Sequence, residues 1–154
     1  MSENVKIIAQ NKKARFDYFV EEKYECGIVL EGTEVKSVKE GNVSFNDSFA
    51  EITNGELWLR NFHISEYSYS SVFNHNPFRV KKLLVHKEEL KKLQRKVEEK
   101  GYTLIPLEVY LKSGIVKIKL GVCRGKKQFD KRESIKERDL NRELHREFKK
   151  ENFR

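Results

Sequence analysis

The chain has 154 residues, of which 36% are charged, and its 32 Lys and Arg against 24 Asp and Glu give a net charge of +8. This length suits one domain with room for an appendage, and the positive charge favours an anionic partner, either nucleic acid or an anionic membrane surface. No apolar run reaches the roughly 18 residues of a membrane span and no signal-peptide core follows Met1, so we expect a cytoplasmic protein that does not bind a membrane. Cys26 and Cys123 lie far apart and the four histidines have no ligand spacing, so we expect free thiols and neither a metal nor another cofactor.

Aromatic and β-branched residues in the first part of the chain predict two short strands. Residues 16–21 and 24–30 follow a basic lead-in and have this composition, with Glu22-Lys23 at the turn between them. Gly27 within the second run predicts a bulge or a close approach of another backbone. We therefore expect the chain to enter a sheet directly after its lead-in.

The next signals predict a short helix and a hairpin. Thr33 is placed to cap a helix over residues 35–39, and Gly41 would end it. Residues 43–53 and 56–64 flank Asn54-Gly55, and both of these residues tolerate the positive φ angles of a type I′ turn. The dipeptide therefore predicts two paired strands.

A stretch rich in Tyr, Ser and Asn follows at residues 65–77 and has no periodicity, so we expect a long loop. Four of its side chains are expected to be exposed, namely Tyr67, Tyr69, Phe73 and His75. Two interpretations remain open for them: they stack on unpaired bases, or they cover one end of a barrel.

The clearest helical pattern covers residues 82–100 and ends at Gly101. Its apolar stripe at helical spacing predicts core packing and consists of Leu83, Leu84, Leu90, Leu93 and Val97. Its lysines are expected to form a solvated face.

Two further strands are predicted over residues 103–111 and 115–123, joined by Lys112-Ser113-Gly114. In the first strand the alternation places Ile105, Leu107, Val109 and Leu111 on one face. In the second it places Val116, Ile118, Leu120 and Val122 on one face, with Lys117 and Lys119 on the other. The hairpin should have one buried side and one basic side.

Together these elements predict a mainly β protein, an OB-like antiparallel barrel of about six strands with two to three helices. A small sheet with one buried face removes its edges by closing in this way. Residues 1–123 would form the body and residues 124–154 a basic tail, since the tail alone holds 12 basic and 7 acidic residues.

The tail contains a dense basic cluster with one aromatic residue at 125–132, which suits an anionic partner that offers flat rings, such as RNA. Further on, basic residues recur every four positions, at Arg138, Arg142, Arg146 and Lys150. This period is close to helical, but the accompanying apolar stripe is thin, so we expect a tail that is unfolded when free and helical on a partner. A merely solvated tail and a helix packed on the barrel remain the alternatives.

Six segments in this order resemble the small protein B family, the partner of transfer-messenger RNA in bacterial ribosome rescue. They begin at Asn11 (NKKARFDYF), Gly32 (GTEVKS), Asp47 (DSF), Arg79 (RVKKLL), Gly101 (GYTLIPL) and Gly125 (GKKQFDKR). The resemblance covers nearly the whole chain and implies a non-catalytic adaptor. Its OB-fold body would grip the tRNA-like domain of transfer-messenger RNA, and its tail would enter the ribosome and turn helical in the empty mRNA channel.

The resemblance also implies the residues of two sites. The RNA-binding set on the body is Asn11, Lys12, Lys13, Arg15, Glu25, Lys36, His75, Arg79, Lys82 and Leu84. The set for the ribosomal decoding centre, and so for small-subunit rRNA, is Gly125, Lys126, Lys127, Phe129, Asp130, Lys131 and Arg132. Relatives often have His where this chain has Phe129, a change that keeps stacking on a base but removes a charged or hydrogen-bonding role. Elongation factor Tu and alanyl-tRNA synthetase would join the same complex through the RNA.

Glu25 is unusual in a site for an anion. It could accept a hydrogen bond from a base amino group or a ribose hydroxyl, or it could orient a nearby lysine.

Two other functions compete with this interpretation. A metal-dependent nuclease would use Glu25, Glu34, Asp47 and Glu51 as oxygen ligands to Mg²⁺, although no two of them lie in a diagnostic motif. A generic basic OB-fold RNA-binding or ribosome-associated protein would rely on charge alone, with little preference among RNAs and a strong salt dependence.

Overall fold

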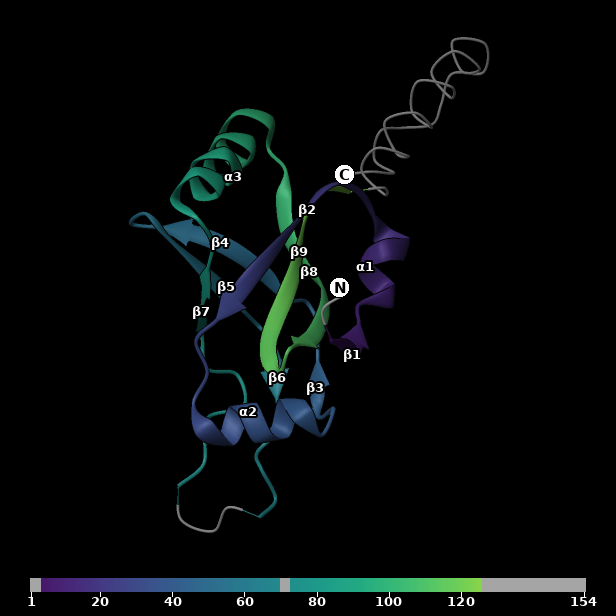
Figure 1. Cartoon of the computed structure of the whole chain (residues 1–154). Helices are drawn as coiled ribbons and strands as arrows, with labels where there is room; N and C mark the ends of the chain where they lie inside the picture. The colour runs from purple at the N-terminus through teal and green to yellow at the C-terminus, as the bar shows by residue number, and fades with distance from the viewer. Residues whose placement is uncertain (1–3, 70–72, 126–154) are drawn as a thin grey trace, which may run out of the picture.

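Strands from both halves of the chain pair into one ring (Figure 1). The computed structural model describes residues 4–69 and 73–125. The strands in these residues are β1 (Val5–Gln10), β2 (Tyr18–Ile28), β3 (Val43–Ser44), β4 (Phe49–Thr53), β5 (Glu56–Arg60), β6 (His63–Ile64), β7 (Lys81–Leu84), β8 (Thr103–Lys112) and β9 (Ile115–Gly125). The helices are α1 (Lys12–Asp17), α2 (Gly32–Lys39) and α3 (Lys87–Lys100).

Six strands close the barrel in the order β8-β4-β5-β7-β2-β9, and β9 pairs back to β8. All of these pairs are antiparallel, so the predicted barrel is confirmed. Outside the ring, β1 pairs with the second half of β8, and β3 pairs with β6. None of the helices in the described residues is long and apolar enough to cross a membrane.

The core fills the interior of this ring with apolar side chains from all six strands. Leu93 of α3 and Val38 of α2 are both fully buried and belong to the same cluster. The two helices lie at opposite ends of the barrel in Figure 1, so each covers one opening. Each such buried side chain stabilises the fold by about 1.5–3 kcal/mol.

A second, smaller apolar cluster lies on the outside of the barrel beneath α1. It joins Ala14 of α1 to Ile105, Leu107 and Cys123. The packing there is tight, because a Cβ at Gly121 would lie 2.8 Å from Leu107 Cδ1. The helix therefore closes the outer face of β8 and β9 over part of their length.

This second cluster shows that the prediction of one apolar face along β8 was wrong. The register of β8 against β9 shifts between Pro106 and Glu108, and an extra residue in a strand reverses its alternation. Ile105 and Leu107 therefore face α1, whereas Val109 faces the barrel interior. In β9 the predicted apolar face is confirmed, with Val116, Ile118, Leu120 and Val122 in the interior cluster.

The prediction of two strands over residues 16–30 was also wrong. Phe16 and Asp17 end helix α1, which the sequence did not predict, and β2 then runs without a turn at Glu22-Lys23. The strand pairs with β9 from Tyr18 to Gly27, and a bulge at Glu21 absorbs the irregularity. Gly27 itself lies opposite Leu84, and a Cβ there would approach Leu84 Cβ to 3.4 Å, in line with the predicted close approach.

The short helix α2 forms where it was predicted but begins earlier. Its N-cap is Glu31 rather than Thr33, and the Glu31 N–H donates to Glu34 Oε1 at 2.7 Å. The hairpin at Asn54-Gly55 is confirmed, with φ angles of 54° and 74° between β4 and β5. Its strands are shorter than predicted, since residues 43–44 and 63–64 form their own pair.

The predicted helix over residues 82–100 starts only at Lys87. Leu83 and Leu84 lie instead on strand β7, between β2 and β5, and His86 caps α3. Burial along Lys81–Leu84 alternates with a period of two, with Lys81 and Leu83 buried, and cross-strand pairing decides in favour of the strand. The helix ends at Gly101 with φ 68°, as predicted.

Candidate nucleic-acid interface

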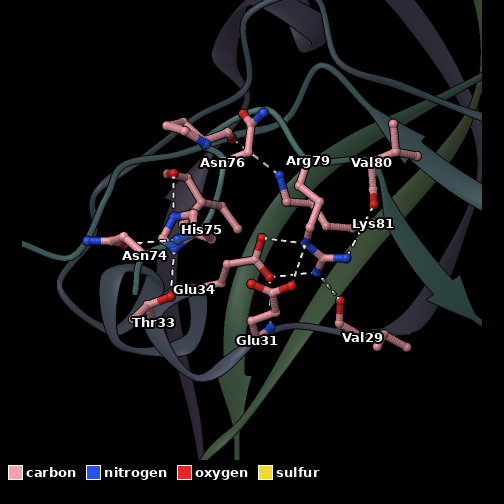
Figure 2. Close-up of polar contacts among 12 residues, drawn as sticks. Val29, Glu31, Thr33, Glu34, Asn74, His75, Asn76, Arg79, Val80 and Lys81 are labelled. Atoms are coloured by element: carbon pink, nitrogen blue, oxygen red, sulfur yellow. Dashed lines mark hydrogen bonds and ion pairs between the residues drawn. The ribbon is translucent and has the colours of Figure 1, made fainter. Parts of the chain in front are cut away.

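A network of charged side chains attaches α2 to the segment that follows the long loop (Figure 2). The Glu34 side chain is fully buried, and Arg79 donates two hydrogen bonds to its carboxylate, at 3.0 and 2.6 Å. Arg79 also donates to the carbonyl of Val29 at 3.1 Å and lies 3.7 Å from Glu31. Burial alone would raise the pKa of Glu34, but the bonds from Arg79 and from the Glu31 N–H outweigh it and lower that pKa.

His75 extends this network from within the long loop, and we refer to Glu34, Arg79, His75 and Thr33 together as the α2 clamp. His75 is only 3% exposed, so the prediction that it is exposed was wrong. Its Nε2 lies 2.8 Å from the Ile64 carbonyl and its Nδ1 lies 2.9 Å from Thr33 Oγ1. Because a carbonyl only accepts, Nε2 carries a proton, and in the neutral ring Nδ1 accepts from the Thr33 hydroxyl. The side chain thus joins the loop to the first turn of α2.

Lys81 supports the base of the same loop from inside the barrel. Its side chain is fully buried, and Nζ donates to the carbonyls of Phe62 at 2.6 Å and Pro77 at 3.4 Å. Burial lowers the pKa of Lys81 to about 8. The ammonium therefore joins the segments before and at the end of the loop through two carbonyl oxygens, and it also lies 5.6 Å from the centre of the Phe62 ring.

This burial predicts that Lys81→Met removes a pH dependence of stability. Between the folded pKa of about 8 and the ordinary value of 10.5, the unfolded chain binds more protons at this position than the folded chain. The folded state therefore gains stability as the pH rises through this range, on the order of 3 kcal/mol in total.

Urea unfolding of the unchanged protein and of Lys81→Met at pH 7.5 and pH 10 measures this effect. The quantity to compare is the difference between the two proteins in their free energy of unfolding, and this difference should change between the two pH values. The raised pKa values of Cys26 and Tyr110 act in the opposite direction but are present in both proteins, so they cancel. A difference between the two proteins that does not change with pH would contradict the prediction.

Exposed side chains of the predicted RNA-binding set lie around the α2 clamp. Lys36 Nζ lies 5.4 Å from the centre of the Tyr67 ring, within the range of a cation–π contact. Tyr69 and Phe73 are 79% and 83% exposed, as predicted for the long loop, whereas Tyr67, which was also expected to be exposed, is half-buried. Aromatic rings held in this way beside a cation suit stacking on unpaired bases.

Strand β7 contributes Lys82 and Leu84. Lys82 Nζ lies 2.9 Å from Glu56 Oε2 in a half-exposed pair, and Leu84 is 49% exposed. Leu84 is therefore a surface residue of a strand and not part of a helical core stripe. Its apolar side chain is open to a base or a sugar.

Glu25 lies on the outer face of β2, where it accepts from Tyr110 Oη at 2.6 Å and from Lys112 Nζ at 3.2 Å. These bonds lower the pKa of Glu25 against the effect of burial. Burial and the bond to Glu25 raise the pKa of Tyr110. Of the roles considered for Glu25, the one that this geometry supports is the orientation of a nearby lysine.

Glu108 of β8 also holds cations by its carboxylate. Its carboxylate lies 3.2 Å from Arg15 and 3.7 Å from Lys119, and Gln10 donates to it at 3.3 Å. We refer to this region as the basic outer face; it consists of Arg15, Glu25, Glu108, Tyr110, Lys112, Lys117 and Lys119. Two carboxylates there hold several cations in place, which leaves positive charge over a shaped surface.

The predicted RNA-binding set includes only Arg15 and Glu25 of the basic outer face, although Lys117 and Lys119 were predicted to lie on the basic side of the last hairpin. The signal for part of the remainder was present, since Lys117 and Lys119 alternate with the apolar residues of β9. Glu108 and Tyr110 were missed for another reason, since their partners Arg15 and Glu25 lie far away in the sequence.

Helix α1 carries the first residues of the predicted set. Lys12 and Lys13 are exposed on its surface, and Phe16 beside them is 77% exposed. Asn11, in contrast, is only 7% exposed. Its Oδ1 accepts from the Ala14 N–H at 3.0 Å and its Nδ2 donates to the Pro106 carbonyl at 2.9 Å. Asn11 therefore holds the first turn of α1 against β8.

Asn11→Ala is therefore expected to destabilise the protein by about 2 kcal/mol. Loss of an N-cap costs about 1 kcal/mol and loss of a buried hydrogen bond about as much again. Urea unfolding measures this, with Lys12→Ala as the matched control because Lys12 is exposed and lies on the same helix. A loss of stability no larger than that of the control would rule out the capping role.

The ten residues predicted to bind RNA come from three parts of the barrel surface, and Arg15 links α1 to the basic outer face through Glu108. One group surrounds the α2 clamp and β7, a second lies on α1, and Glu25 belongs to the basic outer face. The decoding-centre residues after Gly125 and the four basic positions of the predicted tail helix lie outside the described residues. Gly125 itself ends β9, paired with Tyr18, and the predicted division of the chain before Arg124 remains a prediction.

The four carboxylates of the nuclease alternative do not come together. Glu25 pairs with Lys112, Glu34 with Arg79 and Glu51 with Arg60, while Asp47 lies 4.0 Å from Lys13. No group of three or more His, Cys, Asp or Glu side chains suited to a metal ion exists among residues 4–69 and 73–125. The arrangement offers cations and aromatic rings rather than an oxygen ligand set.

Fold and surface together define a small basic β-barrel whose clamped cations and exposed aromatic rings suit a polyanion with flat bases. Comparison with known proteins gives the particular family, since the profile of the SmpB protein matches residues 8–150. The chain belongs to this family.

Relatives with the name SsrA-binding protein resemble the chain over almost its full length. The protein of Treponema denticola is 68% identical over 145 residues, which cover 94% of each chain. That of Desulfitobacterium hafniense is 54% identical over 148 residues, covering 96% and 95%. A solved structure described as "tmRNA-SmpB: a journey to the center of the bacterial ribosome" is 50% identical with a TM-score of 0.66, covering 77% of this chain and 83% of its own.

Proposed function

We propose that the protein is a non-catalytic RNA-binding adaptor, which binds the tRNA-like domain of transfer-messenger RNA and delivers it to stalled ribosomes for trans-translation. The observation that carries this proposal is the 68% identity to an SsrA-binding protein over 94% of both chains. The basic outer face and the exposed aromatic residues agree with it, because cations pair with phosphates and rings stack on bases.

The body would read the shape of the RNA through the ten residues of the predicted set. Lys12, Lys13 and Lys36 are exposed and available to phosphates, and Leu84 offers an apolar surface. Asn11, His75 and Arg79 would act mainly by positioning, since their bonds lie within the protein. Glu25 would act by holding Lys112.

The segment that follows the barrel would contact the decoding centre of a ribosome that lacks a codon. Its proposed residues are Gly125, Lys126, Lys127, Phe129, Asp130, Lys131 and Arg132. Arg138, Arg142, Arg146 and Lys150 would then lie against phosphates along a helix in the mRNA channel. Elongation factor Tu and alanyl-tRNA synthetase would be present through the RNA, and the process would take place in the cytoplasm.

Affinity of the full chain for the tRNA-like domain tests the proposal, with an ordinary tRNA as competitor at near-physiological salt. We expect tight binding that the ordinary tRNA displaces poorly. Equal displacement, with affinity that collapses as salt rises, would indicate the generic basic RNA-binding protein instead.

Two double charge-reversal variants distinguish binding at a particular site from binding that depends only on net charge. Lys12→Glu with Lys13→Glu changes α1, and Lys91→Glu with Lys92→Glu makes the same change on the exposed side of α3. We expect the α1 variant to lose affinity and to show a salt slope smaller by about 2, about 1 for each phosphate contact. Equal losses in the two variants would mean that α1 is not part of the interface.

A further inference from the structure

A hollow of about 220 Å³ lies between α1, residues 46–49 and the start of β8. Its walls combine polar side chains with the apolar surfaces of Ala14, Tyr18, Phe49 and Ile105, and two of its lining residues are acidic. The residues that line it are Asn11, Lys13, Ala14, Asp17, Tyr18, Asn46, Asp47, Ser48, Phe49, Thr103 and Ile105. We refer to it as the α1 hollow.

The charge on the rim distinguishes the α1 hollow from the basic outer face. Asp17 and Asp47 contribute two negative charges, and Lys13 is the one cation among the described residues that line it. Lys13 neutralises them weakly, because its Nζ lies 4.0 Å from Asp47 and the two side chains are 72% and 89% exposed. The hollow therefore suits a cationic occupant with an apolar part, and it disfavours phosphate.

A segment of this description leaves the sheet beside the hollow. Gly125 at the end of β9 pairs with Tyr18, and Cys123 pairs with Thr103, so two lining residues lie next to the end of the strand. The chain continues as Lys126-Lys127-Gln128-Phe129. An extended chain covers at most about 14 Å over the four steps from Gly125 to Phe129, which is enough to turn back onto α1.

We propose that the α1 hollow binds the root of the C-terminal tail of the same chain. The ring of Phe129 would enter the hollow and contact lining residues that include Ala14 and Ile105, and Lys126 and Lys127 would pair with Asp17 and Asp47. The size is sufficient, because an apolar cavity of about 150 Å³ holds a benzene molecule. The tether supplies an effective concentration of the order of millimolar, so even a weak contact is populated.

Such a contact determines where the tail leaves the body. A tail root held against α1 starts from one fixed place on the barrel, next to Lys12 and Lys13. The geometry of the hollow and the order of the chain are enough for this contact, which forms whether or not the body binds RNA.

Methyl NMR on the full-length protein tests this directly. We expect NOEs from the Phe129 ring to the methyl groups of Ala14 and Ile105, and a change in both methyl shifts in Phe129→Ala. Phe148→Ala is the matched control, since it removes a tail ring far from the hollow in sequence and should leave both methyl groups unchanged. Absence of these NOEs, or equal shifts in the two variants, would overturn the proposal.

The charged part of the contact has its own control. Lys126→Glu with Lys127→Glu should weaken the NOEs from Phe129, whereas Lys149→Glu with Lys150→Glu should not. An isotope-filtered experiment on a mixed sample identifies the source of the ring. NOEs between different molecules that fade on dilution would mean that a second copy fills the hollow, which would overturn the intramolecular contact.

Discussion

Arg79→Ala is expected to destabilise the protein by about 3 kcal/mol. The substitution leaves the carboxylate of Glu34 fully buried without its two hydrogen bonds from the guanidinium. Removal of one partner from a buried ion pair typically costs 3–5 kcal/mol, and the lower end applies here because the Arg79 side chain is 30% exposed. Urea unfolding at neutral pH measures the change.

An exposed ion pair on the same barrel provides the control for the α2 clamp. Glu56→Gln removes the partner of Lys82 in a pair whose side chains are 45% and 37% exposed, and we expect a loss of at most about 1 kcal/mol. If Arg79→Ala costs no more than this control, then the clamp does not hold α2 against the loop.

The clamp also predicts how a variant loses RNA affinity. Glu34→Gln keeps every cation of the proposed site but weakens the bonds that orient Arg79. An affinity loss in this variant, measured where it remains folded, would show that α2 and its Lys36 act through their position as well as their charge.

Lys126→Ala together with Lys127→Ala is expected to abolish ribosome rescue and to leave affinity for the tRNA-like domain nearly intact. The reason is the proposed division of labour, in which the body reads the RNA and the segment after β9 contacts the decoding centre. Two measurements check it, namely binding to the isolated domain and tagging of a stalled nascent chain in a reconstituted system.

Lys149→Ala with Lys150→Ala removes the same charge near the end of the tail. Because this control keeps the decoding-centre segment, it should retain more rescue activity than the first variant. An equal fall of RNA affinity and rescue in the Lys126 and Lys127 variant would contradict the division between body and tail.

Several elements were predictable because their signals lie within a few neighbouring residues. Asn54-Gly55 and Ser113-Gly114 both adopt the positive φ angles that two-residue turns need, so both hairpins could be identified before the structure. Gly101 ends α3 for the same kind of local reason. Six ordered segments further identified the family, and this is confirmed by the match over residues 8–150.

The errors lie where a distant strand decides the local conformation. Residues 18–28 form one strand because β9, about a hundred residues later, pairs along nearly all of it. Residues 81–84 form a strand because β2 and β5 lie on either side of them, although their apolar pattern continued that of a helix. Local propensity cannot show either partner.

The candidate interface shows the same difference between local signals and long-range contacts. Its charged residue types and the exposed rings of Tyr69 and Phe73 could be read from the sequence. Only the tertiary structure showed that His75 is buried as a link between loop and helix, that Glu34 holds Arg79, and that Glu25 and Glu108 orient the cations of the basic outer face. The sequence by itself determined the family, the barrel and the basic character of the protein, since these depend on composition and on short motifs. The three-dimensional pairing decided which apolar residues of β8 face the core and which lie under α1, because a single bulge exchanges the two faces of the strand and no local pattern shows where its partner will cause that bulge.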